Sequence, residues 1–266
     1  MSYFDNKVVW ITGASSGIGE ALAYTFAKHK VKLILSARRA EELERVKAAC
    51  GLPDGDIFVL PMDVADHAGF DNAAKRVVEH FGQIDILVNN AGLSHWSKIK
   101  DTNMDVIKTI LNVNFFGAAG LTKAVLPYML EKKKGNIVVI SSILGHIVTP
   151  KQGAYNASKH ALMGFFDTLR AETSGDGIKV LLVCPGFVRT NVAKNSLDRD
   201  GKPINKDNNL IAGGLDPLYV GTQVLNAIES NKEEIVVAGT KEKFAILIKR
   251  FFPSLFSKFI SNSKLA

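Results

Sequence analysis

Short apolar runs alternate with longer helical patterns along most of the chain. The apolar runs are uninterrupted, which is typical of strands that are covered on both faces of a parallel sheet. They predict strands at 8–13, 31–37, 56–64, 85–92, 135–142, 178–186 and 234–239. The segments between them predict helices at 17–28, 40–49, 67–81, 104–130 and 153–173. This order predicts an α/β fold with a doubly wound, seven-stranded parallel sheet.

Two segments depart from the alternation. Residues 187–216 are rich in Asn, Asp, Gly and Lys, and a loop of this length inside a compact domain is usually either a functional lid or disordered. We expect a substrate loop. Residues 241–266 are basic and rich in Phe, with apolar residues at helical spacing that Pro253 interrupts. We therefore expect a single catalytic domain over 1–240 with an amphipathic C-terminal tail over 241–266.

Charge and cysteine content limit the class of protein. The net charge of +7 is concentrated in the tail, which holds six basic residues and one acid. Proteins that bind nucleic acids carry basic patches on the folded body, so we expect no nucleic-acid partner. Cys50 and Cys184 have no paired spacing and belong to no Cys/His cluster, which predicts no metal site and fits a reducing, cytoplasmic compartment. The first apolar run is only of strand length, so it predicts neither a signal peptide nor a membrane span.

A glycine-rich segment, TGASSGIG at 12–19, follows the first strand directly. Gly13, Gly17 and Gly19 let the backbone turn tightly and approach a pyrophosphate, which the N-terminus of the following helix stabilises. A glycine-rich turn without a ligand is the alternative, but the position at the first strand–helix junction favours a dinucleotide site.

The end of the second strand indicates which dinucleotide binds. Sites for NAD usually place an acid there, but this chain has Ala37 followed by Arg38 and Arg39. Guanidinium groups suit the 2′-phosphate of NADP, so we expect NADP(H) in preference to NAD(H), unless the arginines only cover a helix surface. Asp63, after the third strand, is expected either to reach the adenine or to be an exposed turn residue.

Four of the five tyrosines have a lysine four residues later, so this spacing alone identifies no site. Ligands of open parallel sheets bind beyond the carboxyl ends of the strands. Only one pair opens a helix at that edge: Tyr155 and Lys159. The other pairs lie elsewhere: Tyr3 with Lys7, Tyr24 with Lys28, and Tyr128 with Lys132.

Two further residues converge on the same edge. Ser142 ends the fifth strand, and Asn114 lies inside a helical pattern, where an asparagine is poorly suited unless it has a task. We expect Asn114 to bend the helix and to hold a water. The alternatives are that Ser142 only caps the end of its strand and that Asn114 is only a tolerated polar residue. A hydrolase of the triad type is disfavoured because the chain has no G-x-S-x-G elbow, and His146 and His160 have no evident acid partner.

These motifs together resemble the short-chain dehydrogenase/reductase family. The ordered matches are TGASSGIG, NNAG at 89–92, Asn114, Ser142, Tyr155 with Lys159, and PGFVRT at 185–190. The resemblance implies a Rossmann fold and a homodimer or homotetramer. It also implies that Tyr155 is the acid/base, that Lys159 and the positive nicotinamide favour its phenolate, that Ser142 polarises the substrate oxygen, and that Asn114 positions a water. With the glycine segment and the arginines, the expected cofactor residues are Gly13, Ser15, Ser16, Gly17, Ile18, Gly19, Arg38, Arg39, Asp63, Val64, Asn90, Ala91, Gly92, Tyr155, Lys159, Pro185, Gly186, Val188 and Thr190.

The substrate and the tail are less clearly specified. The expected substrate residues are Ser142, Leu144, Tyr155, His95 and Trp96, and their mostly apolar surroundings favour a hydrophobic carbonyl compound or secondary alcohol. The tail is expected either to lie in a membrane interface or to pack against protein. A cofactor-binding sensor or scaffold without turnover is the alternative function on the same fold.

Overall fold

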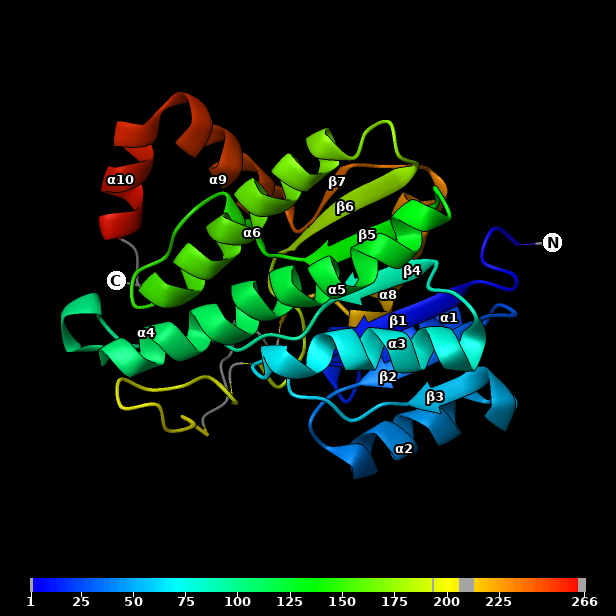
Figure 1. The fold of residues 1–266 in the computed structure, drawn as a ribbon. Coiled ribbons are helices and arrows are strands. Elements are labelled where there is room, and N and C mark those ends of the chain that lie inside the picture. Colours follow the sequence, from blue (N-terminus) through cyan, green and yellow to red (C-terminus); the bar gives the residue numbers. More distant parts are fainter. Residues whose placement is uncertain (1, 193, 206–212, 263–266) are drawn as a thin grey trace.

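Seven parallel strands form one sheet with helices on both faces (Figure 1). The computed structural model describes residues 2–192, 194–205 and 213–262. The strand order is β3-β2-β1-β4-β5-β6-β7, so the order reverses between β1 and β4. The strands are β1 Val8–Thr12, β2 Lys32–Ser36, β3 Ile57–Val59, β4 Ile86–Asn89, β5 Gly135–Ile140, β6 Ile178–Pro185 and β7 Glu234–Val237. The predicted doubly wound, seven-stranded fold is confirmed.

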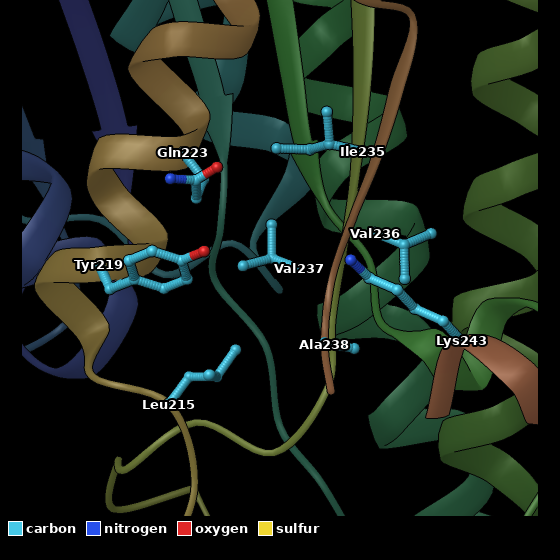
Figure 2. A pocket seen from close by; sticks show the side chains of 8 residues that line it. All are labelled: Leu215, Tyr219, Gln223, Ile235, Val236, Val237, Ala238 and Lys243. Atoms are coloured by element: carbon cyan, nitrogen blue, oxygen red, sulfur yellow. The ribbon is translucent and has the colours of Figure 1, made fainter. Parts of the chain in front are cut away.

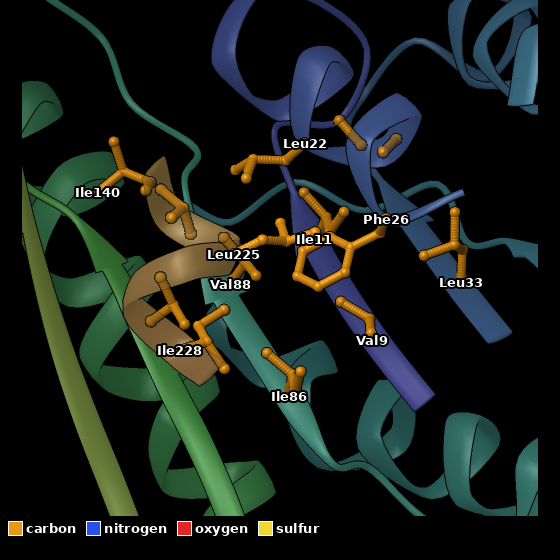
Figure 3. Packing of buried hydrophobic residues seen from close by; sticks show 14 of the residues in the cluster. Val9, Ile11, Leu22, Phe26, Leu33, Ile86, Val88, Ile140, Leu225 and Ile228 are labelled. Atoms are coloured by element: carbon orange, nitrogen blue, oxygen red, sulfur yellow. The ribbon is translucent and has the colours of Figure 1, made fainter. Parts of the chain in front are cut away.

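Each face of the sheet buries its own hydrophobic cluster. Val9 and Ile11 face α1 Gly17–Phe26, α2 Ala40–Cys50 and α8 Pro217–Glu229, where Phe26 is fully buried (Figure 3). Their neighbours Val8 and Trp10 face the opposite cluster, formed with α3 Phe70–Phe81, α5 Gly117–Glu131 and α6 Gly153–Glu172. Burial on both faces explains why the strands read as continuous apolar runs.

Three elements differ from the prediction. The third strand is only three residues long, and α8 was absent from the predicted elements. The sequence does contain a signal for the start of α8. Asp216 caps this helix by accepting from the Leu218 amide, and Pro217 occupies its first turn. The predicted helix 104–130 is divided into α4 Met104–Leu111, a π-helical segment Asn112–Phe116 and α5.

The stretch Met104–Glu131 is long and apolar enough to cross a membrane by length and composition alone. Half of its most apolar part is buried inside the protein, and α5 packs on the sheet, so we interpret it as a core helix. The tail forms α9 Thr240–Phe251 and α10 Pro253–Ser261, which confirms the helical spacing and its interruption at Pro253. Lys264, part of the predicted basic tail, lies outside the described residues.

The core makes a first prediction about stability. Phe26→Ala removes a fully buried ring and should lower the free energy of unfolding by about 3–5 kcal/mol. Phe244→Ala is the matched control, because that ring is 61% exposed and its loss should change stability by no more than about 0.5 kcal/mol. Urea denaturation of both variants measures the difference, and equal losses would contradict this account of the core.

Candidate active site

The glycine segment forms a tight cradle between β1 and α1. Gly13 and Gly17 have φ of +64° and +61°, a region that favours glycine. At Gly19 any side chain would collide with the Gly13 carbonyl, so the backbone approaches itself closely here. Ser16 caps α1 without a side-chain hydrogen bond to the first amides of the helix. A backbone cradle at a helix N-terminus fits the pyrophosphate of a dinucleotide.

The NNAG segment is tied to this cradle by hydrogen bonds. Thr12 Oγ1 accepts from the amides of Asn90 (3.0 Å) and Ala91 (3.1 Å). Asn90 Nδ2 donates to the Thr12 carbonyl at 2.9 Å, and its side chain also fills the space beside Gly13. On the other side, Thr190 lies against Gly17. The structure therefore brings together the predicted segments 12–19, 89–92 and 185–190.

Basic side chains border the cradle. Arg39 Nη2 donates to Ser15 Oγ at 3.3 Å, while Arg38 is exposed. Arg45, which was not predicted, donates to the Ser15 carbonyl at 3.3 Å and to Glu20 Oε1 at 2.7 Å. The sequence did hold a signal for Arg45. It follows Arg39 by about one and a half turns of α2, and α2 packs beside α1.

Asp63 forms the local contact expected of a turn residue. Its Oδ1 accepts from the Ala65 amide at 2.9 Å. Val64 lies against Gly117, where a Cβ would approach the Val64 carbonyl to 2.6 Å. The adenine contact of Asp63 therefore stays a prediction.

Ser142, Tyr155 and Lys159 meet where β5 ends and α6 begins. Tyr155 lies close enough to Ser142 for that hydroxyl to lower the pKa of its phenol. Ser142 Oγ accepts from the Leu144 amide at 3.1 Å and donates to the Pro185 carbonyl at 3.5 Å. Lys159 Nζ lies 5.5 Å from the centroid of the Tyr155 ring and donates to the Ile140 carbonyl at 2.8 Å. Lys159 is only 4% exposed, an unusual position for a lysine.

Burial controls the pKa values of this pair. It raises the pKa of Tyr155 to about 12, against the lowering effect of the Ser142 hydrogen bond. It lowers the pKa of Lys159 to about 8. Loss of hydration is the dominant cause for both groups. The expected effect of Lys159 and the positive nicotinamide on the phenol stays a prediction.

The other tyrosine–lysine pairs have members that make structural contacts. Tyr24 donates to Glu20 Oε1 at 2.7 Å, and Lys132 Nζ donates to the Gly82 carbonyl at 2.8 Å. Lys7 lies 5.4 Å from the centroid of the Tyr3 ring and 3.7 Å from Asp85. Only Tyr155 and Lys159 lie at the start of a helix that follows the carboxyl end of a strand, as the sequence analysis expected.

Asn114 lies in the π-helical segment, as expected of a residue that disturbs its helix. Its Oδ1 accepts from the Leu93 amide at 2.7 Å. Its Nδ2 donates to the Leu93 carbonyl and to Ser158 Oγ, both at 2.9 Å. The carboxamide is therefore used to hold the loop after β4, and the water that we expected there stays a prediction.

The expected substrate residues lie in different surroundings. Leu144 belongs to an apolar cluster with Ile143, Ile147 and Phe256, against which Tyr155 packs. Phe256 comes from α10 and was not predicted at this site. The spacing of apolar residues in the tail was the available signal, because it could have distinguished an inner helix face from an outer one. Trp96 is half-buried and pairs with Leu197 through its backbone amide.

His95 is 1% exposed, and burial lowers its pKa. Its Nδ1 has no hydrogen-bond partner in the structure. The expected contact of His95 with a substrate stays a prediction.

Two expectations about His146 need correction. It has an acid partner, because its Nε2 lies 3.1 Å from Glu234 Oε1, and the same nitrogen lies 3.5 Å from Cys184 Sγ. The ligand atoms of these three side chains lie within 4.8 Å of one another, so the fold assembles a Cys/His/Glu group that spacing alone does not reveal. A hydrolytic triad uses both ring nitrogens, whereas here one nitrogen makes both contacts. Absence of a metal stays a prediction.

A pocket of about 280 Å³ lies between α8 and β7 (Figure 2). Its lining is Leu215, Tyr219, Gln223, Ile235, Val236, Val237, Ala238 and Lys243. None of the predicted catalytic residues lines it, so we do not interpret it as the site of reaction.

The family model for short chain dehydrogenases matches residues 7–201. The chain belongs to the short-chain dehydrogenase/reductase family. It is 52% identical over 197 residues to human dehydrogenase/reductase SDR family member 7, covering 72% of this chain and 58% of that relative's length. It is 40% identical over 259 residues to dehydrogenase/reductase SDR family protein 7-like of Anopheles gambiae, covering 96% and 82%.

The fold has a solved counterpart in this family. A short chain dehydrogenase/reductase from Burkholderia phymatum in complex with NAD has a TM-score of 0.86 and 25% identity, and the match covers 96% of each chain. Membership supports an oxidoreductase with a nicotinamide dinucleotide site, in agreement with the cradle after β1.

The His146–Glu234 contact makes a prediction about acid stability. The hydrogen bond holds the pKa of Glu234 below its ordinary value, so it stabilises the fold above the unfolded-state pKa and is lost as pH falls through the folded-state pKa. His146→Ala should therefore lower Tm more at about pH 6 than at about pH 3. In a Glu234→Gln background this pH dependence should disappear, and a Tm difference that is the same at both pH values would refute the assignment.

Proposed function

We propose that this protein is an NADP(H)-dependent oxidoreductase that interconverts a hydrophobic carbonyl compound and its secondary alcohol. One observation carries the proposal: Tyr155, with the Ser142 hydroxyl nearby, packs beside the buried amine of Lys159 at the carboxyl edge of the sheet. A proton donor and a polarising hydroxyl thus lie together next to the dinucleotide cradle.

The residues divide the work of carbonyl reduction. Ser142 donates a hydrogen bond to the substrate oxygen, and Tyr155 protonates that oxygen; in alcohol oxidation Tyr155 accepts the proton. Since burial raises the pKa of Tyr155 to about 12, the phenol is protonated at neutral pH and ready for the reductive direction. Lys159, with its pKa lowered to about 8, is positioned to replenish the proton.

The cradle fits the cofactor that the family implies. Gly13, Gly17 and Gly19 would hold the pyrophosphate, and the bordering Arg38 and Arg39 would hold a 2′-phosphate, with Arg45 beside them. When bound, the nicotinamide ring supplies or accepts the hydride. The further cofactor contacts proposed for Asn90 and Thr190 follow from their places beside the cradle.

The substrate class follows from the apolar cluster beside Tyr155. Ile143, Leu144, Ile147 and Phe256 present side chains that bind hydrophobic surface and offer no charge. We also propose a homodimer or homotetramer, since Phe116 is 52% exposed, and a cytoplasmic location, since Cys50 and Cys184 are unpaired.

Tyr155→Phe tests the acid/base assignment. The variant should lose about 10²–10⁴-fold in kcat, because the carbonyl oxygen loses the acid that protonates it. Its Kd for NADPH should change little, as fluorescence titration would measure. Tyr128→Phe is the control and should keep the kcat of the unmodified protein. Retention of more than a few per cent of kcat in Tyr155→Phe would exclude the assignment.

The alternative, a sensor or scaffold without turnover, gives a different outcome. It predicts NADPH binding but no oxidation or reduction of any compound in a panel of hydrophobic carbonyls and alcohols. The same panel, run with NADPH and NADP⁺, therefore separates the two functions.

The arginines test cofactor choice. The double variant Arg38→Ala/Arg39→Ala should lower kcat/KM for NADPH by about 10–100-fold and leave that for NADH nearly unchanged, because only NADPH loses a charge-assisted contact. Arg76→Ala, which removes a positive charge on α3, is the control. Comparable kcat/KM for the two cofactors in the unmodified protein would rule out the NADP preference.

A further inference from the structure

The two tail helices have one face packed on the protein and one face without a partner. On the inner face, Phe256 is 4% exposed and packs with Ile143, Leu144 and Ile147, and Ile246 and Ile248 pack against the same cluster. In Figure 1, α9 and α10 lie at one end of the molecule, beyond the layers that cover the sheet.

The outer face is unusually apolar. Of the twelve large hydrophobic side chains that are exposed in the described parts of the chain, five lie on α9 and α10 and a sixth, Phe252, lies between them. We call these six residues the outer face; they are 52–66% exposed and comprise Phe244, Leu247, Phe251, Phe252, Leu255 and Phe259. A concentration of this kind marks a surface that meets an apolar environment.

Basic residues are interleaved with the outer face. Lys241, Lys243, Arg250 and Lys258 are exposed, Lys249 is half-buried, and Glu242 is the single acid in 241–262. A two-fold contact with a second copy would bring these like charges together, which is unfavourable. An anionic lipid surface instead pairs with the charges while its acyl region accepts the rings.

We propose that the outer face of α9 and α10 docks on an anionic phospholipid bilayer and sets the substrate site at the membrane surface. The inner face of the same helices covers the loop that carries Ile143 and Leu144, next to Tyr155. A hydrophobic carbonyl compound dissolved in the bilayer thus reaches the cluster beside the candidate active site with little exposure to water. This second step rests on the proposed function; the docking itself does not.

Vesicle flotation of the full chain tests the docking. The protein should float with vesicles of phosphatidylcholine and phosphatidylserine, more weakly with phosphatidylcholine alone, and less as salt is raised. Phe251→Ser/Phe252→Ser should reduce the bound fraction at least fivefold. The matched control Ile99→Ser/Met104→Ser removes two exposed apolar side chains from the body and should float like the unmodified protein.

Point variants are preferable to truncation at residue 240, because removing α10 also removes Phe256 from the substrate loop. Circular dichroism and Tm should be unchanged in both double variants, since all four side chains are largely exposed. Absence of vesicle binding, equal flotation of both double variants, or salt-resistant self-association through the outer face without vesicle binding would overturn the proposal.

A second measurement separates failure of docking from failure of the proposed function. With a bilayer-dissolved ketone, Phe251→Ser/Phe252→Ser should raise apparent KM, while kcat/KM for a small water-soluble ketone stays unchanged. Flotation without turnover of either ketone would overturn the proposed function and the substrate-delivery step but support docking. Turnover without flotation would overturn docking and leave the proposed function intact.

Discussion

Parallel pairing of the central strands is the constraint on which the candidate site depends. The pairs Ile11 with Val88, Asn89 with Val139, and Ile140 with Val183 bring the carboxyl ends of β1, β4, β5 and β6 to one edge. At each of these strand ends the chain continues into a different part of the candidate site. These parts are the glycine cradle, NNAG, Ser142 and Pro185–Gly186. Residues far apart in the sequence therefore meet because the strands pair, and hydrogen bonds such as those between Thr12 and Asn90 then hold the segments together.

Local patterns accounted for the fold and for the place of the site. Continuous apolar runs identified all seven strands because both faces of the sheet are covered, and the carboxyl-edge rule distinguished Tyr155 from three equally spaced tyrosines. Patterns failed where tertiary contacts decide. Arg45 contacts Ser15 from a second helix, for which its place on α2 after Arg39 was only an indirect signal. Cys184, His146 and Glu234 meet from separate parts of the chain, and no spacing encodes their contact.

The electrostatics of the site were the least predictable feature. A phenol beside an amine suggests mutual stabilisation of charge, but burial disfavours charge on both groups. The Ile140 carbonyl supplies the contact that keeps the Lys159 amine from being an unpaired buried donor. Burial shifts both groups toward their neutral forms, and the sequence does not show how much water the finished fold removes from them.

The cluster that contains Leu144 and Phe256 shows that the proposed reactive residues and the proposed substrate-binding residues come from different parts of the chain. The family model ends at residue 201, whereas α10, which supplies Phe256, begins at Pro253. The matched region carries the groups that we propose to react, and the C-terminal helices supply apolar side chains beside them. Two family members with the same tyrosine, lysine and serine could thus diverge in the molecules they accept through their final helices alone, so inheritance of a reaction type does not imply inheritance of a substrate.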